Sequence, residues 1–362
     1  MTGIESYVRH SAKEAKPYFP ISKSLTPTRK DVIRMHANEN PLGPSPKVVQ
    51  AIIDTAAIVN RYPDPSYLEL RQRIAKYVSL KPENVLVGGG SDEAIDMLIK
   101  TFVNPGDEAI ISVPTFEVYE KILKLAEGRP VFIPMQKKFY WDIEGIKQAI
   151  SQRTKLIFIC SPNNPTGSAI TENDAEELAL TGKLLVIDEA YAEFSARTLI
   201  PLVQKYENVI ILRTFSKFLG LAGLRVGYVL ACPEIINYLD RVRLPFNVSL
   251  LAERAAITAL DDIQYAIKAR ALVRKWKRYL YSELAKIRKI RAFPSEANFI
   301  LIDVTASRHS STEIVNALSK LGILVRDCAG AKGLEGEYIR VSIGLKEENE
   351  RFIKALKTIL KA

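Results

Sequence analysis

A lysine that follows an apolar run is the first candidate for chemistry in this sequence. After Asn208, residues 209–212 are apolar and predict a buried strand, which is followed by the hydroxyl side chains of Thr214 and Ser216 and then by Lys217. Three glycines follow, with Arg225 among them, so the backbone can approach a bulky group while the guanidinium reaches an anion. Such a lysine suits a Schiff base to an aldehyde cofactor whose phosphate is held nearby. A surface lysine beside a flexible loop explains this stretch equally well.

Other polar or aromatic residues also follow apolar runs. Asp188 ends the run at residues 184–187, where an ionised carboxylate is costly unless it has a partner. A protonated pyridine nitrogen would be such a partner, and the ion pair would keep the ring an electron sink. Tyr191 and Asn164 could each approach the phenolic oxygen of that ring, and Phe116 offers a flat face for stacking.

A glycine-rich segment, Gly88-Gly-Gly-Ser-Asp92, precedes a predicted helix. Its glycines allow close approach, and the N-terminus of the helix offers backbone N–H groups to a phosphate. Ser91 and Asp92 are also good helix-capping residues whatever the loop binds. The segment alone therefore fits a phosphate site or an ordinary helix start.

The elements that must position these residues form a βα rhythm. Seven short runs are apolar at nearly every position and do not alternate, at residues 85–87, 109–113, 131–133, 156–160, 184–187, 209–212 and 228–231. Such runs predict an α/β fold with a mainly parallel sheet buried on both faces, leaving room for one antiparallel strand at an edge. Because open α/β sheets bind ligands at the carboxyl ends of their strands, we expect the polar residues after the runs to share one site.

The pattern changes near residue 250, where long basic helices replace the βα rhythm. Further apolar runs and a last helix then predict a smaller α+β unit. We therefore divide the chain into an N-terminal arm with part of the small domain (1–45), a large cofactor-binding domain (46–249) and a C-terminal small domain (250–362).

Composition argues against several classes of protein. The 362 residues are 47% hydrophobic, which supports a sizeable core, and no stretch is long and apolar enough to span a bilayer. The first residues lack the basic-then-apolar pattern of a signal peptide, so we expect a cytoplasmic location. The three cysteines and three histidines are scattered, which predicts no disulfide, metal site or Ser-His-Asp triad. The net charge of +10 is spread along helical stretches without interleaved aromatics, and attraction of small anionic substrates explains it as well as nucleic acid does.

Three segments together resemble a known family. The chain is similar to the fold-type I, pyridoxal-phosphate-dependent aminotransferases in Asn164-Pro-Thr-Gly167, in Asp188-Glu-Ala-Tyr191 and in Ser216-Lys217 with the following Gly223–Tyr228. The similarity runs nearly end to end. It implies a large domain with a mostly parallel seven-stranded sheet and a smaller α+β domain. Within that superfamily the chain resembles the histidinol-phosphate aminotransferases, in segments that begin at His36, Asn60, Gly90, Pro245, Val325 and Ile339.

The resemblance implies a role for each matching residue. Lys217 would bind the cofactor covalently and move the proton at the substrate's Cα, with Asp188 at the ring nitrogen and Tyr191 at the ring oxygen as further catalytic residues. The other implied cofactor ligands are Ser91, Asp92, Phe116, Asn164, Thr214, Ser216 and Arg225, with Tyr62 contributed by the second subunit of a homodimer. The implied substrate ligands are Arg326, Arg340, Asn38 and Tyr18, with no metal.

The implied reaction is transamination between L-histidinol phosphate and 2-oxoglutarate in histidine biosynthesis, giving imidazole acetol phosphate and L-glutamate. Transamination and decarboxylation use the same kind of residues to bind pyridoxal phosphate. Threonine-phosphate decarboxylase and an aromatic or broad-specificity aminotransferase therefore stay as alternatives. Gly89 stands where related sequences often carry a polar residue, and Phe116 where tyrosine is common. Arg340 alternates with Tyr338 and Ser342, a pattern that also fits a solvated strand face.

Overall fold

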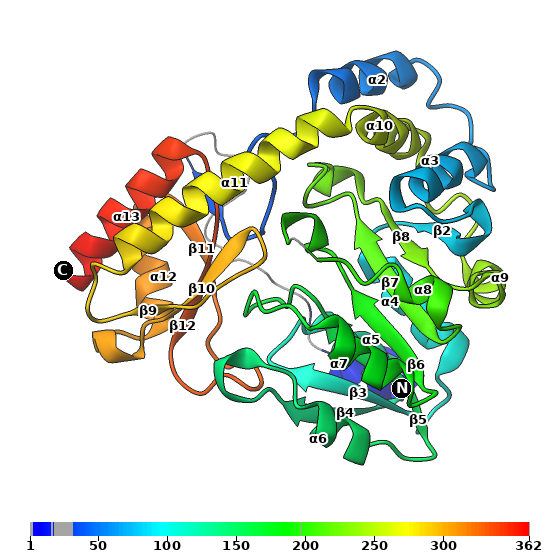
Figure 1. Ribbon diagram of the computed structural model, residues 1–362, viewed down its shortest axis with the longest axis horizontal. Coiled ribbons are helices and arrows are strands. Elements are labelled where there is room, and N and C mark those ends of the chain that lie inside the picture. Colours follow the sequence, from blue (N-terminus) through cyan, green and yellow to red (C-terminus); the bar gives the residue numbers. More distant parts are fainter. Residues whose placement is uncertain (1–2, 16, 18–31, 196, 362) are drawn as a thin grey trace.

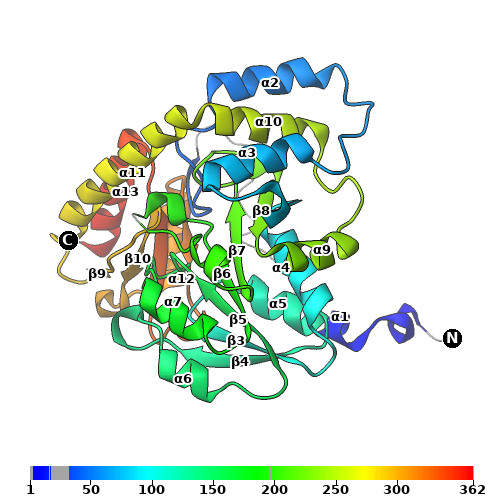
Figure 2. The same cartoon turned by 45° about the vertical axis from the view of Figure 1, so that its right-hand side comes forward.

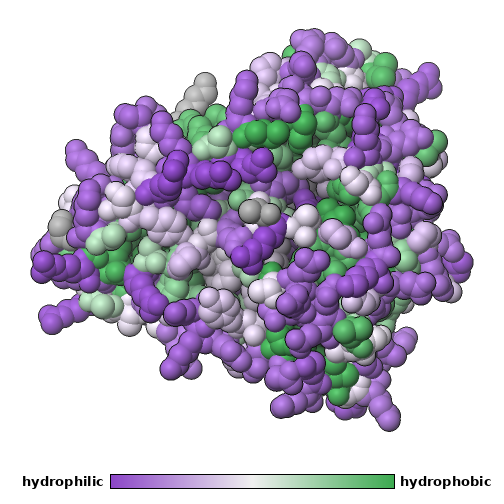
Figure 3. All heavy atoms as spheres, in the orientation of Figure 1, coloured by the Kyte–Doolittle hydropathy of each residue, from purple (hydrophilic) through white to green (hydrophobic). Residues whose placement is uncertain are grey.

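The computed structural model describes residues 3–15, 17, 32–195 and 197–361, so Tyr18 lies outside the described residues. Two sheets, each with its own helices, make up the molecule (Figure 1). Hydrophilic side chains cover most of the face seen in Figure 3. No helix among these residues is long and apolar enough to cross a membrane.

The larger sheet has seven strands in the order β2-β8-β7-β6-β5-β3-β4. All seven predicted runs form its strands, which are β2 (Val85–Gly88), β3 (Glu108–Val113), β4 (Arg129–Pro134), β5 (Thr154–Cys160), β6 (Leu184–Asp188), β7 (Val209–Thr214) and β8 (Gly227–Leu230). The strand β8 is antiparallel to both of its neighbours, β2 and β7. The expectation of an edge position for such a strand is wrong. The chain returns from β7 to β8 with only the short 3-10 turn Ala222–Leu224 between them, and antiparallel neighbours need no crossover helix.

Alternate residues of the strands face two separate cores. In β7, Val209 and Ile211 belong to one core, and Ile210 and Leu212 belong to the other. Because both faces are buried, each strand is mainly apolar. The helices α4 (Ser91–Phe102), α5 (Val118–Leu125) and α9 (Pro233–Val242) cover one face, while α6 (Ile143–Gln148), α7 (Glu172–Ala179) and α8 (Leu202–Lys205) contribute to the other.

The smaller sheet has the order β1-β11-β12-β10-β9. Its strands are β1 (Ile33–Met35), β9 (Arg291–Ala292), β10 (Phe299–Asp303), β11 (Ile323–Asp327) and β12 (Tyr338–Ser342). The helices with it are α11 (Ile263–Leu284), α12 (Ser311–Lys320) and α13 (Lys346–Leu360). Since β1 pairs in parallel with β11, a segment from the N-terminal part of the chain joins this sheet.

Three further helices pack together beside the large sheet. The helix α10 (Leu250–Asp261) lies against α2 (Pro46–Ala56) and α3 (Leu68–Val78), as Figure 2 also shows. The short α1 (His10–Glu14) contacts α5. The predicted domain boundaries at 45 and 249 stay a prediction.

Candidate active site

A cleft of about 700 Å³ is lined by residues that follow the carboxyl ends of the large-sheet strands and by residues of the small sheet. Thirteen of the residues singled out in the sequence line it: Asn38, Ser91, Asp92, Phe116, Asn164, Asp188, Tyr191, Thr214, Ser216, Lys217, Arg225, Arg326 and Arg340. The structure therefore brings them together, as expected for the open edge of an α/β sheet. Their individual roles stay predictions.

Lys217 lies in the loop after β7. Its Nζ donates a hydrogen bond to the carbonyl oxygen of Ala37 at 2.8 Å and lies 5.8 Å from the centre of the Tyr191 ring. Burial lowers the pKa of Lys217 to about 8, and the nearby Arg340 guanidinium adds to the effect. A lowered pKa increases the fraction of neutral amine near neutral pH, which is the form that attacks a carbonyl.

Hydroxyl and guanidinium groups gather at one end of the cleft. The Thr214 hydroxyl donates to Ser216 Oγ at 2.9 Å, and Arg225 Nη1 donates to the same Ser216 oxygen at 3.2 Å. Arg225 Nη2 also donates to Asp92 Oδ2 at 3.1 Å, in the first turn of α4. Together with the first backbone N–H groups of α4, these donors form a cradle suited to a phosphate.

Two glycines allow this cradle to close. Gly90 has φ +93°, and a Cβ there would lie 2.5 Å from Arg225 Nη2. A Cβ on Gly227 would lie 2.6 Å from the carbonyl carbon of Gly90 and 2.7 Å from Ser91 N. A side chain on Gly227 would therefore push the start of α4 away from β8, and one on Gly90 would displace the Arg225 guanidinium.

Asp188 is buried at the end of β6. Its Oδ2 accepts a hydrogen bond from the Tyr119 hydroxyl at 2.6 Å, and its Oδ1 accepts one from the Ala190 N–H at 3.0 Å. Burial raises the pKa of Asp188 to about 6 although both hydrogen bonds favour the ionised form. A positive group in the cleft would stabilise this carboxylate, in agreement with the sequence argument. The sequence analysis missed Tyr119, because no local pattern shows that this face of α5 reaches β6.

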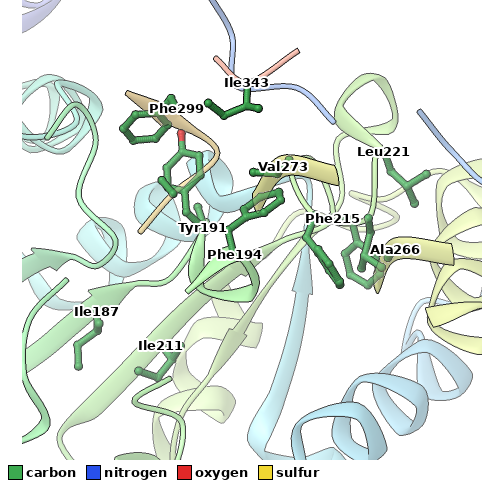
Figure 4. Close-up of a cluster of buried hydrophobic side chains, with 14 of the residues drawn as sticks. Ile187, Tyr191, Phe194, Ile211, Phe215, Leu221, Ala266, Val273, Phe299 and Ile343 are labelled. Atoms are coloured by element: carbon green, nitrogen blue, oxygen red, sulfur yellow. The ribbon is translucent and has the colours of Figure 1, made fainter. Parts of the chain in front are cut away.

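Tyr191 and Asn38 form a second buried pair. Tyr191 accepts a hydrogen bond from Asn38 Nδ2 at 3.0 Å. Its ring packs edge-to-face on Phe299 with centroids 5.1 Å apart, and Figure 4 shows the two rings beside each other. Burial raises the pKa of Tyr191, so its hydroxyl keeps its proton and can donate to an oxygen atom in the cleft. Asn38 is itself fixed, because its backbone N–H donates to Ser342 Oγ at 2.9 Å.

A buried ion cluster positions the segment that carries Tyr191. Arg213 of β7 contacts Glu189 Oε2 and Glu193 Oε1, each at 2.7 Å, and all three side chains are buried. Glu189 Oε1 also accepts the Leu199 N–H at 2.6 Å. These ion pairs connect β7 to the segment after β6. They therefore fix the position of that segment, which carries Tyr191 and begins directly after Asp188. The sequence analysis did not single out Arg213, although an arginine inside an apolar strand implies buried carboxylate partners.

Two arginines of the small sheet stand directly opposite each other, Arg326 on β11 and Arg340 on β12. Arg340 is buried, with Nη2 donating to the carbonyl oxygen of His36 at 2.6 Å and Nη1 bonded to Asn164 Oδ1. The alternative of a solvated face is therefore wrong for Arg340. Arg326 Nη2 contacts Glu117 Oε1 at 3.1 Å. Like charges opposite each other on neighbouring strands repel, so this pair favours a bound anion in the cleft.

Tyr62 does not line the cleft of its own chain. Its side chain is 79% exposed, and its ring stacks on Phe246 at 4.4 Å between centroids. A contribution of Tyr62 to the site of a second subunit stays a prediction.

The residues of the cleft fit pyridoxal phosphate. The cradle that depends on the two glycines offers donors for a phosphate, and the buried Asp188 lacks only a positive partner for its charge. Lys217 supplies an amine of lowered pKa for the aldehyde, and Phe116 lines the same cleft with a flat aromatic face.

This fold and this donor set define a fold-type I aminotransferase that uses pyridoxal phosphate. The family model for aminotransferase class I and II matches residues 30–356. Histidinol-phosphate aminotransferase of Methanothermobacter thermautotrophicus is 39% identical over 358 residues, which cover 96% of each chain. Histidinol-phosphate aminotransferase of Methanocaldococcus jannaschii is 39% identical and covers 99% of this chain and 98% of its own. The structure of histidinol-phosphate aminotransferase from Sinorhizobium meliloti in complex with pyridoxal-5'-phosphate has a TM-score of 0.82 at 29% identity and covers 91% of both chains. The chain therefore belongs to the class I and II aminotransferases and, within them, to the histidinol-phosphate aminotransferase family.

Proposed function

We propose that this aminotransferase moves the amino group of L-histidinol phosphate to 2-oxoglutarate, giving imidazole acetol phosphate and L-glutamate, as a step of histidine biosynthesis. The observation that carries the proposal is the opposed pair Arg326 and Arg340 in the cleft that also holds Lys217. Both amino carriers are anions, one with a phosphate and the other with carboxylates. One pair of guanidinium groups can serve each of them in turn.

The chain's own residues would hold pyridoxal phosphate at both ends. Thr214, Ser216 and Arg225, with the first N–H groups of α4, would bind its phosphate. Asp188 would pair with the ring nitrogen and Phe116 would stack on the ring. When bound, the cofactor withdraws electrons from the substrate's Cα and so makes its proton acidic.

Lys217 and its neighbours would then carry out the proton transfer. Once the substrate amine has displaced Nζ from the cofactor's aldehyde, its pKa lowered to about 8 favours the neutral amine, which would accept the Cα proton and pass it on to the cofactor. Tyr191, held by Asn38, would donate to the ring oxygen. Asn164 would do the same through its amide nitrogen, because its Oδ1 already accepts from Arg340. The residues of the large and small sheets that line the cleft would exclude water while the proton moves.

A homodimer with shared sites is part of this proposal. The segments that carry Tyr62 and its stacking partner Phe246 also expose Ile58, Val59 and Leu244, and exposed apolar side chains of this size favour burial against a second copy. Tyr62 of one subunit would then reach the phosphate end of the other subunit's cleft. A cytoplasmic location stays a prediction.

The test is a rapid-mixing absorbance measurement on the yellow purified protein. L-histidinol phosphate, added without a second substrate, should bleach the yellow band, and 2-oxoglutarate should restore it. L-threonine phosphate serves as the comparison. If only threonine phosphate reacts and carbon dioxide is released, the chain is a decarboxylase and the proposal is wrong.

A further inference from the structure

His36 lies in the cleft, and none of the roles described above uses its imidazole. It follows β1 directly, lines the cleft and is only 5% exposed. Its carbonyl oxygen accepts from Arg340 Nη2, and the next carbonyl, that of Ala37, accepts from Lys217 Nζ. The backbone at His36 is thus held between the arginine expected to bind substrate and the lysine expected to bind cofactor.

One nitrogen of the imidazole lacks a partner among the described residues. Nδ1 is buried and has no hydrogen-bond partner within the described part of the chain. A buried polar atom without a partner costs free energy. Because Nδ1 has almost no accessible surface, the ring must turn toward the cleft before a bound molecule can supply that partner. The scattered positions of the three histidines in the sequence gave no sign that one of them would lie here.

The charges around His36 are mainly positive. Arg34, Arg340, Arg326 and Lys217 all act on it, while Glu39 pairs with Arg34 at 2.6 Å and Glu117 pairs with Arg326 at 3.1 Å. Burial, together with these cations, lowers the pKa of His36 to about 4, so the ring is neutral near pH 7. A neutral imidazole still has one N–H to donate, and a bound dianion would reverse the local field and favour a second proton.

We propose that His36 is a substrate-binding residue that donates a hydrogen bond to the phosphate of the phosphorylated substrate, beside Arg326 and Arg340. The inference rests on the proposed function and adds the means by which the site tells a phosphate from a carboxylate. A phosphate monoester presents three terminal oxygens and close to two charges, whereas a carboxylate presents two oxygens and one charge. Two guanidinium groups can satisfy a carboxylate, and the extra oxygen of a phosphate needs the further donor that His36 provides.

The first experiment observes the imidazole directly. Because the chain has three histidines, the holoenzyme labelled with carbon-13 at the imidazole gives three signals, and His36→Ala assigns one of them. The holoenzyme is used so that the cofactor's own phosphate site is filled. Inorganic phosphate should move the His36 signal toward its protonated position and leave those of His10 and His309 in place. Glutarate, a dicarboxylate probe, should move it much less.

The second experiment separates the two substrates. His36→Ala should raise KM for L-histidinol phosphate by about tenfold or more, equivalent to about 1.4 kcal/mol or more for a lost hydrogen bond to a charged group. KM for 2-oxoglutarate should stay within about twofold of the wild-type value. His36→Gln, which keeps an N–H donor, should recover part of the loss. His309→Ala is the matched control, since its side chain is 44% exposed and His309 does not line the cleft.

Two results would overturn the inference. The first is a wild-type spectrum in which phosphate moves none of the three histidine signals, and this result needs no variant. The second is an equal rise in KM for both substrates in His36→Ala, because that outcome indicates a structural role. Failure of the proposed function would look different, since the wild-type protein would then not be bleached by histidinol phosphate at all.

Discussion

Tyr119→Phe removes one hydrogen bond to Asp188 and leaves the packing around it unchanged. The Tyr119 ring stacks on Phe158 with centroids 4.9 Å apart, and a phenylalanine ring keeps that contact. The hydroxyl donates to Asp188 Oδ2 at 2.6 Å, so it stabilises the ionised carboxylate. Losing it should therefore raise the pKa of Asp188.

The size of the effect follows from the charge on the acceptor. A hydrogen bond to a charged group contributes about 1.5–3 kcal/mol, and one pKa unit corresponds to about 1.36 kcal/mol. The pKa of Asp188 in the cofactor-free protein should thus rise by roughly one to two units from about 6. At pH 6.5 the variant's carboxyl group is mostly protonated and must lose its proton before it can pair with the ring nitrogen, which weakens cofactor binding by roughly tenfold. At pH 9 Asp188 is ionised in both proteins. The variant then lacks the hydrogen bond equally with and without cofactor, so its affinity for the cofactor should match that of the wild type.

The assay is the affinity for pyridoxal phosphate, measured by absorbance or fluorescence titration from pH 6 to pH 9. The quantity compared is the ratio of dissociation constants, variant over wild type, because other groups that titrate in this range affect both proteins. Tyr281→Phe is the control, since it removes a tyrosine hydroxyl that donates to Phe293 O at 2.8 Å away from the cleft. A ratio for Tyr119→Phe that does not change with pH would refute the argument.

Three further predictions concern the cofactor. Lys217→Ala should abolish turnover while part of the cofactor stays bound, as judged by absorbance after gel filtration, and normal turnover would exclude the proposed proton transfer. Gly227→Ala should weaken retention of the cofactor by displacing the start of α4, whereas Gly223→Ala should have little effect because nothing lies within 4 Å of a Cβ there; equal losses in the two variants would contradict the cradle. Tyr62→Phe keeps the stacking on Phe246 but should lower cofactor affinity in the dimer, and a fully active monomer would show that the sites are not shared.

The sequence by itself determined the seven strands of the large sheet and the group of residues at its carboxyl edge. Both depend on local chemistry. A strand buried on both faces must be mainly apolar, and a polar residue directly after it lies at the edge of the sheet. Lys217, Asp188 and Asn164 could therefore be assigned to one site before any contact between them was known.

Only the tertiary structure decided which side chains meet across long stretches of chain. Tyr119 reaches Asp188 across 69 residues, and Arg340 reaches the carbonyl of His36 across 304. The register that sets Arg326 opposite Arg340 likewise depends on how two strands pair, as does the internal antiparallel position of β8. Apolar periodicity specifies which face of an element is buried but not which element covers it, so these contacts follow from packing and register alone.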